Sequence, residues 1–273
     1  MVRIIAFLVG LGFVSALLIG VVIPREAAEE SASHKFHLHP KEVSYSTDGP
    51  LGKFDQAQLQ RGFQVYKEVC SACHSMSRVR FGDLTALGYT PGQVKTIAAE
   101  WTTETPSINP DTGEPATRKS LPSDKFPSPF ANEVAARAAN NNALPPDLSL
   151  ITKAREGGAS YVYSLLTGYT DPPANLPKDA QPSDGLHYNP YFANLNLSMA
   201  QPLVADDQVS YGEGAPKATV DQMAKDVSAF LIWTAEPKLE NRHRAGLATL
   251  IFLLIFSVLT YMSYKSIWAD KKH

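Results

Sequence analysis

The chain has 273 residues, of which 44% are hydrophobic and 19% are charged, and its formal net charge is −2. This size allows one sizeable core, and two uncharged apolar runs hold much of the hydrophobicity, so the middle is rather polar. Between Glu29 and Glu240 there are 18 Lys and Arg against 25 Asp and Glu, a net charge of −7. This balance argues against nucleic-acid binding. It fits a basic protein partner attracted at long range, and it fits equally well a charge that only keeps the domain soluble.

The first apolar run extends from Ile4 to Ile23 and is long enough to cross roughly 30 Å of hydrocarbon. It is longer than the apolar stretch of a cleaved signal, and Pro24 to Ala28 matches a small-x-small cleavage site poorly. We therefore expect residues 1–28 to be either a retained transmembrane anchor or a signal peptide. Both fates export the chain beyond residue 28, because Arg3 favours a cytoplasmic amino terminus.

Residues 29–54 are polar and are expected to form a linker. Three histidines in this stretch, His34, His37 and His39, could ligate a metal, but no regular element is expected to hold them in place. Solvated loop histidines are the other interpretation, and the pattern favours it.

A helix is expected to begin at Asp55, whose carboxylate can cap backbone N–H groups, with Gln58 completing a capping box. Helical spacing then places four side chains on one face: Leu59, Phe63, Tyr66 and Cys70. This face leads from the core to a cysteine motif.

Cys70, Cys73 and His74 form a C-x-x-C-H pattern, which is typical of covalent haem c attachment. Each thiol can add to one haem vinyl group, and the adjacent imidazole can serve as an axial ligand of the iron. A zinc site would need four ligands, and the chain contains no other cysteine. A thioredoxin-like redox pair would need a strand–turn–helix setting, and the residue after its second cysteine would not have to be histidine. Haem c is therefore the favoured interpretation.

Further short helices are expected, separated by two long segments rich in Pro, Gly, Ser and Asp, Thr105 to Phe130 and Thr170 to Pro190. No packed element is expected in the first of these segments. Two prolines keep the segment from Ala143 to Ser149, here called the proline strip, out of a helix. This strip could form a wall beside a flat cofactor or be an ordinary surface loop. The expected helices are Gln93–Trp101, Asn132–Ala139, Leu150–Glu156 and Ser160–Thr167.

Met199 is the methionine best placed to be a second axial ligand of a haem iron, because it lies in a loop before Pro202. Of the other four methionines, Met1 is the initiator and Met262 belongs to the second apolar run, while Met76 is too close to His74 and Met223 occupies a helical core position. If Met199 is not the ligand, His187 is the next candidate.

The last helix of the exported part is expected to begin at a Thr219 cap and to end before Pro237, and to pack back on the first helix. The second apolar run, Ala245 to Tyr264, can again span a membrane. These patterns predict a mainly α protein. It comprises a c-type cytochrome domain of short helices around one covalent haem over residues 55–240, and a C-terminal transmembrane anchor with a short tail over residues 241–273.

Six stretches occur in a specific order: Arg61–Tyr66, Cys70–Met76, Ala135–Asn141, Leu144–Ser149, Tyr163–Tyr169 and Ala235–Pro237. In this ordered set the sequence resembles the cytochrome c1 family. The resemblance covers roughly His39 to the second anchor, and its ordered motifs are more specific than a bare C-x-x-C-H. It implies that His74 is the fifth iron ligand, Met199 the sixth, and Arg137 the partner of a haem propionate.

The resemblance implies the haem subunit of a respiratory quinol–cytochrome c oxidoreductase, the cytochrome bc1 complex, which takes electrons from a Rieske iron–sulfur protein and passes them to a c-type cytochrome. Such a subunit performs no bond chemistry itself, and its expected neighbours are cytochrome b, the Rieske protein, the membrane and a second copy of the complex. The resemblance also implies a bacterial inner membrane location, with a periplasmic haem domain and a cytoplasmic C-terminus. Two rivals stay open: a haem enzyme with a vacant iron position, and a membrane-anchored electron shuttle outside any complex.

Overall fold

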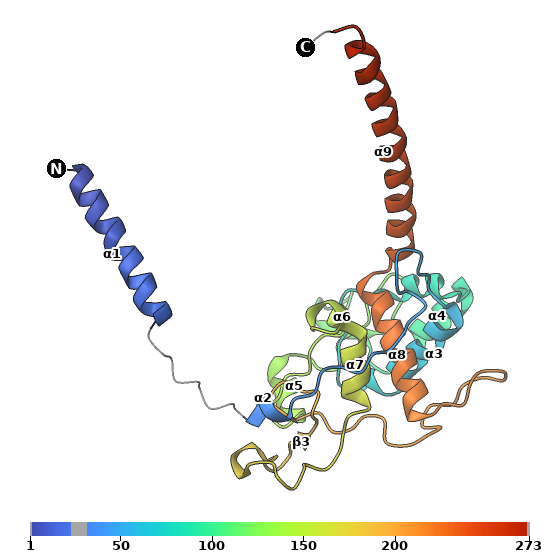
Figure 1. The fold of residues 1–273 in the computed structure, drawn as a ribbon. Helices are drawn as coiled ribbons and strands as arrows, with labels where there is room; N and C mark the ends of the chain where they lie inside the picture. The colour runs from blue at the N-terminus through green and yellow to red at the C-terminus, as the bar shows by residue number, and fades with distance from the viewer. Residues whose placement is uncertain (1, 23–31, 272–273) are drawn as a thin grey trace.

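The computed structural model describes residues 2–22 and 32–271 of the chain. The expected cleavage region, Pro24 to Ala28, lies outside the described residues. The described part is mainly α-helical, as predicted (Figure 1), and it also contains two small antiparallel hairpins that were not predicted. Its α-helices are α1 (Val2–Val22), α2 (Ala32–Phe36), α3 (Gln56–Glu68), α4 (Pro91–Ala99), α5 (Glu133–Ala139), α6 (Ile151–Ala154), α7 (Gly158–Leu166), α8 (Val220–Ala235) and α9 (Leu239–Trp268). The 3-10 helices are η1 (Cys70–Ala72), η2 (Phe81–Leu87) and η3 (Lys178–Ala180), and the strands are β1 (Thr105–Ile108), β2 (Pro115–Arg118), β3 (His187–Tyr188) and β4 (Asn196–Leu197).

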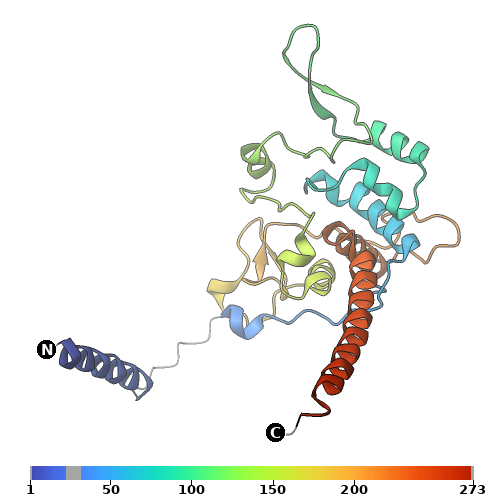
Figure 2. The same ribbon diagram turned by 90° about the horizontal axis from the view of Figure 1, so that it is seen from above.

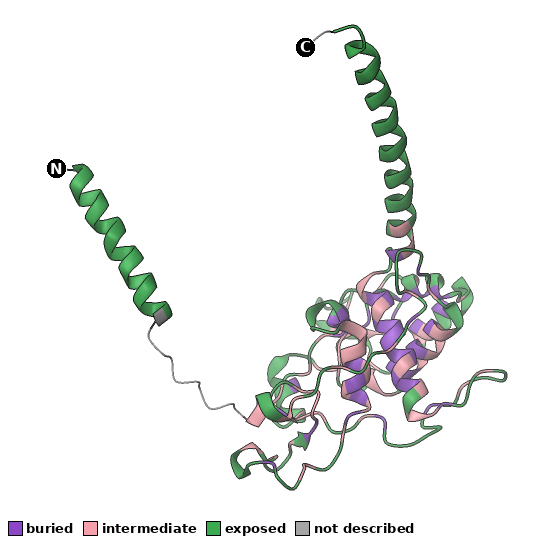
Figure 3. Cartoon of the chain, in the orientation of Figure 1, coloured by how far each residue is buried: buried purple, intermediate pink, exposed green. Residues whose placement is uncertain are grey.

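Helices α1 and α9 are long and apolar enough to cross a membrane by length and composition. Both are exposed along nearly their whole length, whereas the buried residues gather where α3, α7 and α8 pack together (Figure 3). The charged residues of both helices lie near their ends, and a long uncharged apolar surface between them is stable only when a hydrocarbon phase covers it. The prediction of a C-terminal membrane helix is thus confirmed.

Helix α3 begins as predicted, because the Asp55 carboxylate accepts a hydrogen bond from the backbone N–H of Gln58 at 3.1 Å. The expected capping box is only half formed. The Gln58 side chain donates instead to Oδ1 of Asp226 on α8, at 3.0 Å. A long-range acceptor has therefore replaced the local one.

Helices α3 and α8 cross in close contact at Gly62. A Cβ atom at this position would lie 2.1 Å from the carbonyl oxygen of Asp226, so only glycine allows the two backbones to approach this closely. Beside the contact, Arg61 Nε forms an ion pair with Asp226 Oδ2 at 2.8 Å. The Asp226 side chain is fully buried, and Gln58 and Gln222 satisfy its other oxygen. Removing one member of such a buried pair typically costs about 3–5 kcal/mol.

An aromatic cluster fills the space beside α3. Neighbouring ring centroids in this cluster lie 4.6–6.4 Å apart, in stacked, tilted and edge-to-face arrangements. Rings in these geometries add specific attraction to the hydrophobic effect of their burial. The cluster ties α3 to α8, to η2 and to the loops around them. Its members are Phe63, Tyr66, Phe81, Trp101, Phe126 and Phe230.

The segment from Thr105 to Phe130 differs from the expectation that it would hold no packed element. Strands β1 and β2 pair antiparallel in it, with Thr105 opposite Arg118, and the hairpin projects from the domain (Figure 2). Phe126 is buried in the aromatic cluster. The expectation was wrong because proline and serine only disfavour helices, and a hairpin open to solvent can accommodate them at its edges.

The expected linker is packed on the domain from Leu38 onward, after a short helix, α2. The Leu38 N–H donates to the Pro190 carbonyl at 2.8 Å, and the Lys41 N–H donates to Ser164 Oγ at 2.8 Å. Tyr45 is buried against the main core. The polar composition of this stretch therefore reflects hydrogen bonding to the domain surface as well as solvation.

We expect Gly62→Ala to lower the free energy of unfolding by about 1–3 kcal/mol, because the new methyl group must push α8 away. The measurement is urea unfolding of the full chain in detergent, followed by tryptophan fluorescence. Gly92→Ala on α4 is the matched control, since the nearest atom to its new Cβ is 4.0 Å away. Equal unfolding free energies for the two variants would contradict the close crossing.

Candidate haem-binding site

The C-x-x-C-H residues lie in one tight turn at the end of α3. After α3 ends at Glu68, the chain forms the tighter 3-10 helix η1. The N–H groups of Cys73 and His74 both donate to the Cys70 carbonyl, at 3.1 and 2.9 Å. Cys70 is half-buried, Cys73 is exposed, and both thiols are free. Burial raises the pKa of the Cys70 thiol to about 12, so this group stays protonated at neutral pH. The motif comes after a helix rather than a strand, which is not the setting of a thioredoxin-like pair.

His74 is oriented by a backbone carbonyl. Its Nδ1 lies 2.8 Å from the Pro146 oxygen, and since a carbonyl only accepts, Nδ1 carries the proton. The lone pair therefore resides on Nε2, which is the arrangement of a metal-ligating histidine. Burial lowers the pKa of His74, although the Pro146 carbonyl and the nearby Asp147 act in the opposite direction. The imidazole is thus held neutral, in the form that binds a metal.

The proline strip lies beside the motif and is hydrogen-bonded to it. The Leu148 N–H donates to the Ser75 carbonyl at 2.9 Å, and the Arg78 N–H donates to Ser149 Oγ at 3.1 Å. Because Pro146 also holds His74, the strip is a structural wall of the site and not an independent surface loop.

Asp147 stabilises this wall, and the sequence analysis did not identify it. Its Oδ2 accepts from Ser75 Oγ at 2.9 Å and from the Ser77 N–H at 2.8 Å, while its Oδ1 accepts from the Ser149 N–H at 2.9 Å. Burial raises the pKa of Asp147, but the hydrogen bonds from these three serines outweigh it, so the pKa is lowered. The bond to Ser149 is an Asx turn, a local signal readable in Asp-x-Ser. The two bonds to the motif cross about 70 residues and have no local signal.

Met199 lies in the loop after β4 and is half-buried. Its carbonyl accepts a hydrogen bond from the Tyr169 hydroxyl at 2.9 Å, and burial raises the pKa of this phenol, which keeps it a donor. The alternative ligand, His187, is on β3, where it pairs with Leu197 of β4, and it is exposed. Of these two candidate ligands, Met199 is therefore the less solvated.

Arg137 is on α5 and is exposed. Its Nη1 donates to the Asn142 carbonyl at 3.1 Å, across a turn in which Asn141 and Asn142 adopt left-handed backbone angles. This turn leads directly into the proline strip. Arg137 forms no ion pair with any residue in 2–22 or 32–271, which leaves its charge available to an anionic group.

The structure thus joins Cys70, Cys73 and His74 in one turn, while Met199 and Arg137 come from separate elements. Two free thiols and a neutral imidazole with a free Nε2 are a donor set that fits a covalently attached haem. Within the described parts of the chain, no group of three or more His, Cys, Asp or Glu side chains is arranged to hold a metal ion.

Comparison with known proteins agrees with this geometry. Residues 45–271 match the model of the Cytochrome C1 family. Cytochrome c1 of Rhodospirillum rubrum is 43% identical over 266 residues, covering 93% of this chain and 96% of that protein. Cytochrome c1, heme protein, mitochondrial of Saccharomyces cerevisiae is 46% identical, covering 90% and 77%. A cytochrome b/c1 of Bradyrhizobium diazoefficiens is 42% identical, covering 85% of this chain and 36% of that protein. The chain therefore belongs to the cytochrome c1 family, the haem subunit of the cytochrome bc1 complex.

Proposed function

We propose that this member of the cytochrome c1 family accepts electrons from a Rieske iron–sulfur protein and passes them to a c-type cytochrome through one covalently bound haem c. The observation that carries the proposal is the turn that presents Cys70, Cys73 and a His74 with a free Nε2 on one side. When bound, the haem supplies a one-electron iron couple. The protein itself forms no bond to a substrate and acts as the electron-transfer subunit of a larger enzyme.

Each residue has a separate task in this proposal. Cys70 and Cys73 would hold the haem covalently, each thiol adding its S–H across one vinyl group. His74 Nε2 and the Met199 thioether would ligate the iron, while the Tyr169 hydroxyl holds the Met199 backbone in place. Arg137 pairs with a propionate through a charge-assisted hydrogen bond. Ligation by two side chains that the fold holds in place would favour rapid one-electron transfer.

The membrane arrangement is inferred from the two apolar helices that flank the domain. If both α1 and α9 span the membrane, the domain lies on one side and both chain ends on the other. Covalent haem attachment outside the cytoplasm then assigns the domain to the periplasm and the C-terminus to the cytoplasm of a bacterial inner membrane. Cytochrome b is the expected neighbour of α9 in a dimeric complex, and the joined b/c1 chain among the relatives supports this pairing.

Met199→Leu tests the rival of a haem enzyme with a vacant iron position. We expect covalent haem to be retained and the cost to folding to stay under about 1.5 kcal/mol, because leucine has a similar volume. The redox potential should fall and reduced iron should bind carbon monoxide, as shown by potentiometric titration and absorption spectra. Met223→Leu in the core of α8 is the control and should change neither. If the Met199→Leu variant keeps the wild-type redox potential and binds no carbon monoxide, the sixth ligand must be another residue, and His187 is the next candidate.

Asp147→Asn tests the wall that orients His74. The amide has only one acceptor end, so it must lose either the bonds from Ser75 and Ser77 or the bond from the Ser149 N–H, and we expect a loss of about 1–2 kcal/mol in the free energy of unfolding at pH 7. Because folding lowers the pKa of Asp147, its contribution is present above the ordinary value of 3.8 and is lost as the pH falls through the lowered value. The stability difference from the wild type should therefore narrow below pH 3.8. Asp83→Asn, at a carboxylate that accepts a single backbone N–H, is the control.

Salt dependence tests whether the acidic domain attracts a basic acceptor. The Debye length falls from about 10 Å at 0.1 M salt to about 3 Å at 1 M, so reduction of a basic c-type cytochrome should slow over this range. The measurement is stopped-flow absorbance, with oxidation by a neutral small molecule as the control. A rate of cytochrome reduction that does not change with salt would leave the net charge of −7 as a determinant of solubility only.

A further inference from the structure

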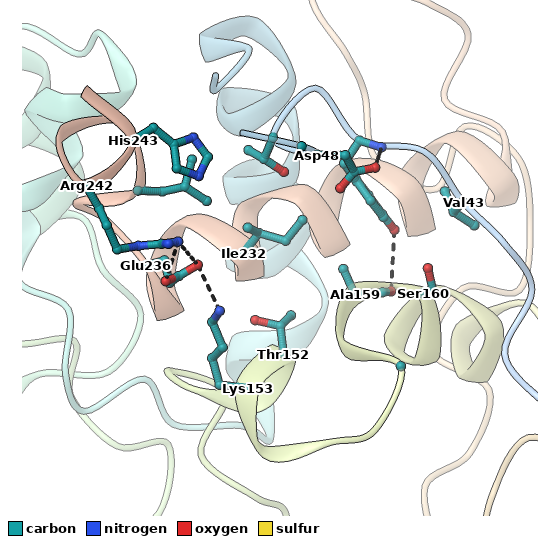
Figure 4. Close-up of a pocket in the computed structure, with 15 residues that line it drawn as sticks. Val43, Asp48, Thr152, Lys153, Ala159, Ser160, Ile232, Glu236, Arg242 and His243 are labelled. Atoms are coloured by element: carbon teal, nitrogen blue, oxygen red, sulfur yellow. Dashed lines mark hydrogen bonds and ion pairs between the residues drawn. The ribbon is translucent and has the colours of Figure 1, made fainter. Parts of the chain in front are cut away.

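A cavity of about 370 Å³ opens at the end of the domain where α9 begins (Figure 4). Its walls are the segment 43–49, helices α6 and α7, the end of α8 and the first turn of α9. This volume is within the range of small-molecule binding sites. The residues assigned to the haem do not line it.

The cavity carries both signs of charge, on different sides. On one side Glu236 is paired with Lys153 at 2.8 Å and with Arg242 at 2.9 Å, so that this side keeps one net positive charge. On the other side lies Asp48, whose Oδ2 accepts the Tyr45 N–H at 2.8 Å (Figure 4). Across residues 2–22 and 32–271 Asp48 has no ion-pair partner. Ile232 lies between the two sides.

With the apolar run of α9 across a membrane, the cavity comes to the level of the lipid headgroups. Arg242 precedes Ala245, where the apolar run of α9 starts, by three residues, which is about 4.5 Å along a helix. The headgroup layer on each side of a bilayer is roughly 5–7 Å thick. Two bonds fix the loop above the cavity to this helix: the Phe54 N–H donates to Glu240 at 3.0 Å, and His243 Nδ1 contacts the Gly52 carbonyl at 3.2 Å. The cavity is therefore fixed relative to the start of the apolar run of α9.

We propose that this membrane-side cavity binds the headgroup of a zwitterionic phospholipid of the phosphoethanolamine type. The phosphodiester contacts Lys153 and Arg242, the ammonium group contacts Asp48, and the acyl chains extend along the apolar surface of α9. A purely anionic headgroup offers no cation to Asp48, which disfavours it. The proposal depends on α9 spanning the membrane and is independent of the redox reaction.

The test is lipid retention by the full-length protein in its complex, purified in mild detergent. Lipids are extracted and phosphatidylethanolamine is quantified by mass spectrometry per mole of polypeptide, so the result does not depend on haem content. Asp48→Asn keeps an acceptor for the Tyr45 N–H but removes the charge, and Lys153→Gln leaves Glu236 paired with Arg242. Asp111→Asn and Lys119→Gln, which change the same charges near the β1–β2 hairpin, are the matched controls.

We expect about one tightly held phosphatidylethanolamine per chain in the wild type and in both controls, and about tenfold weaker retention in each cavity variant, or about 1.4 kcal/mol. Delipidated protein should also bind phosphatidylethanolamine in nanodiscs in preference to phosphatidylglycerol. Equal retention in all variants, or preference for phosphatidylglycerol, would overturn the proposal. Soluble glycerophosphoethanolamine that binds as tightly as the lipid would overturn the assignment to a membrane ligand.

Discussion

The contact between α3 and α8 at Gly62 positions the rest of the domain. Without a side chain at Gly62 the two helices touch backbone to backbone, and the buried Asp226 beside the contact is satisfied by Arg61 and two glutamines. An ion pair of this kind adds little net stability by itself. If α8 shifted along α3, however, the buried charge of Asp226 would lose its partners, so the ion pair disfavours every other alignment of the two helices. Because α3 ends two residues before Cys70, the register of this crossing also sets where the attachment turn lies.

From this fixed turn, the site is built by hydrogen bonds to a segment that cannot be helical. The two prolines of the proline strip keep the Pro146 carbonyl out of any helix. This carbonyl is therefore free to accept a hydrogen bond from the Nδ1–H group of His74. Asp147 then anchors the strip through the serines that come after the histidine. One short stretch thus selects the imidazole tautomer and limits the movement of the ring, two properties that a metal ligand requires.

The elements with local signals were predicted from the sequence. Asp55 and Thr219 cap the first and last helices of the domain as expected, and both helices bury the predicted face. The C-x-x-C-H motif predicts its chemistry because spacing alone defines it.

Features that depend on residues far apart in the chain were missed: the bonds of Asp147 to Ser75 and Ser77, the burial of Phe126, and the packing of Tyr45 on the core. Nothing in a short window distinguishes these residues from ordinary loop residues, since their partners lie tens of residues away. The roles of Met199 and Arg137 stay predictions for the same reason, because their relation to the iron depends on loops folded from different parts of the chain.

The short junction between α8 and α9 restricts how the domain can move. Only Glu236 to Lys238 separate the two helices, and Arg242 reaches back across the junction to Glu236. The loop before α3 is bonded to the same first turn of α9 through Glu240 and His243. A domain attached in this way turns with its stem as one body, and it cannot swing between distant positions on a flexible tether. In the proposed function, any diffusion or reorientation that electron transfer requires must therefore take place in the electron donor and the electron acceptor.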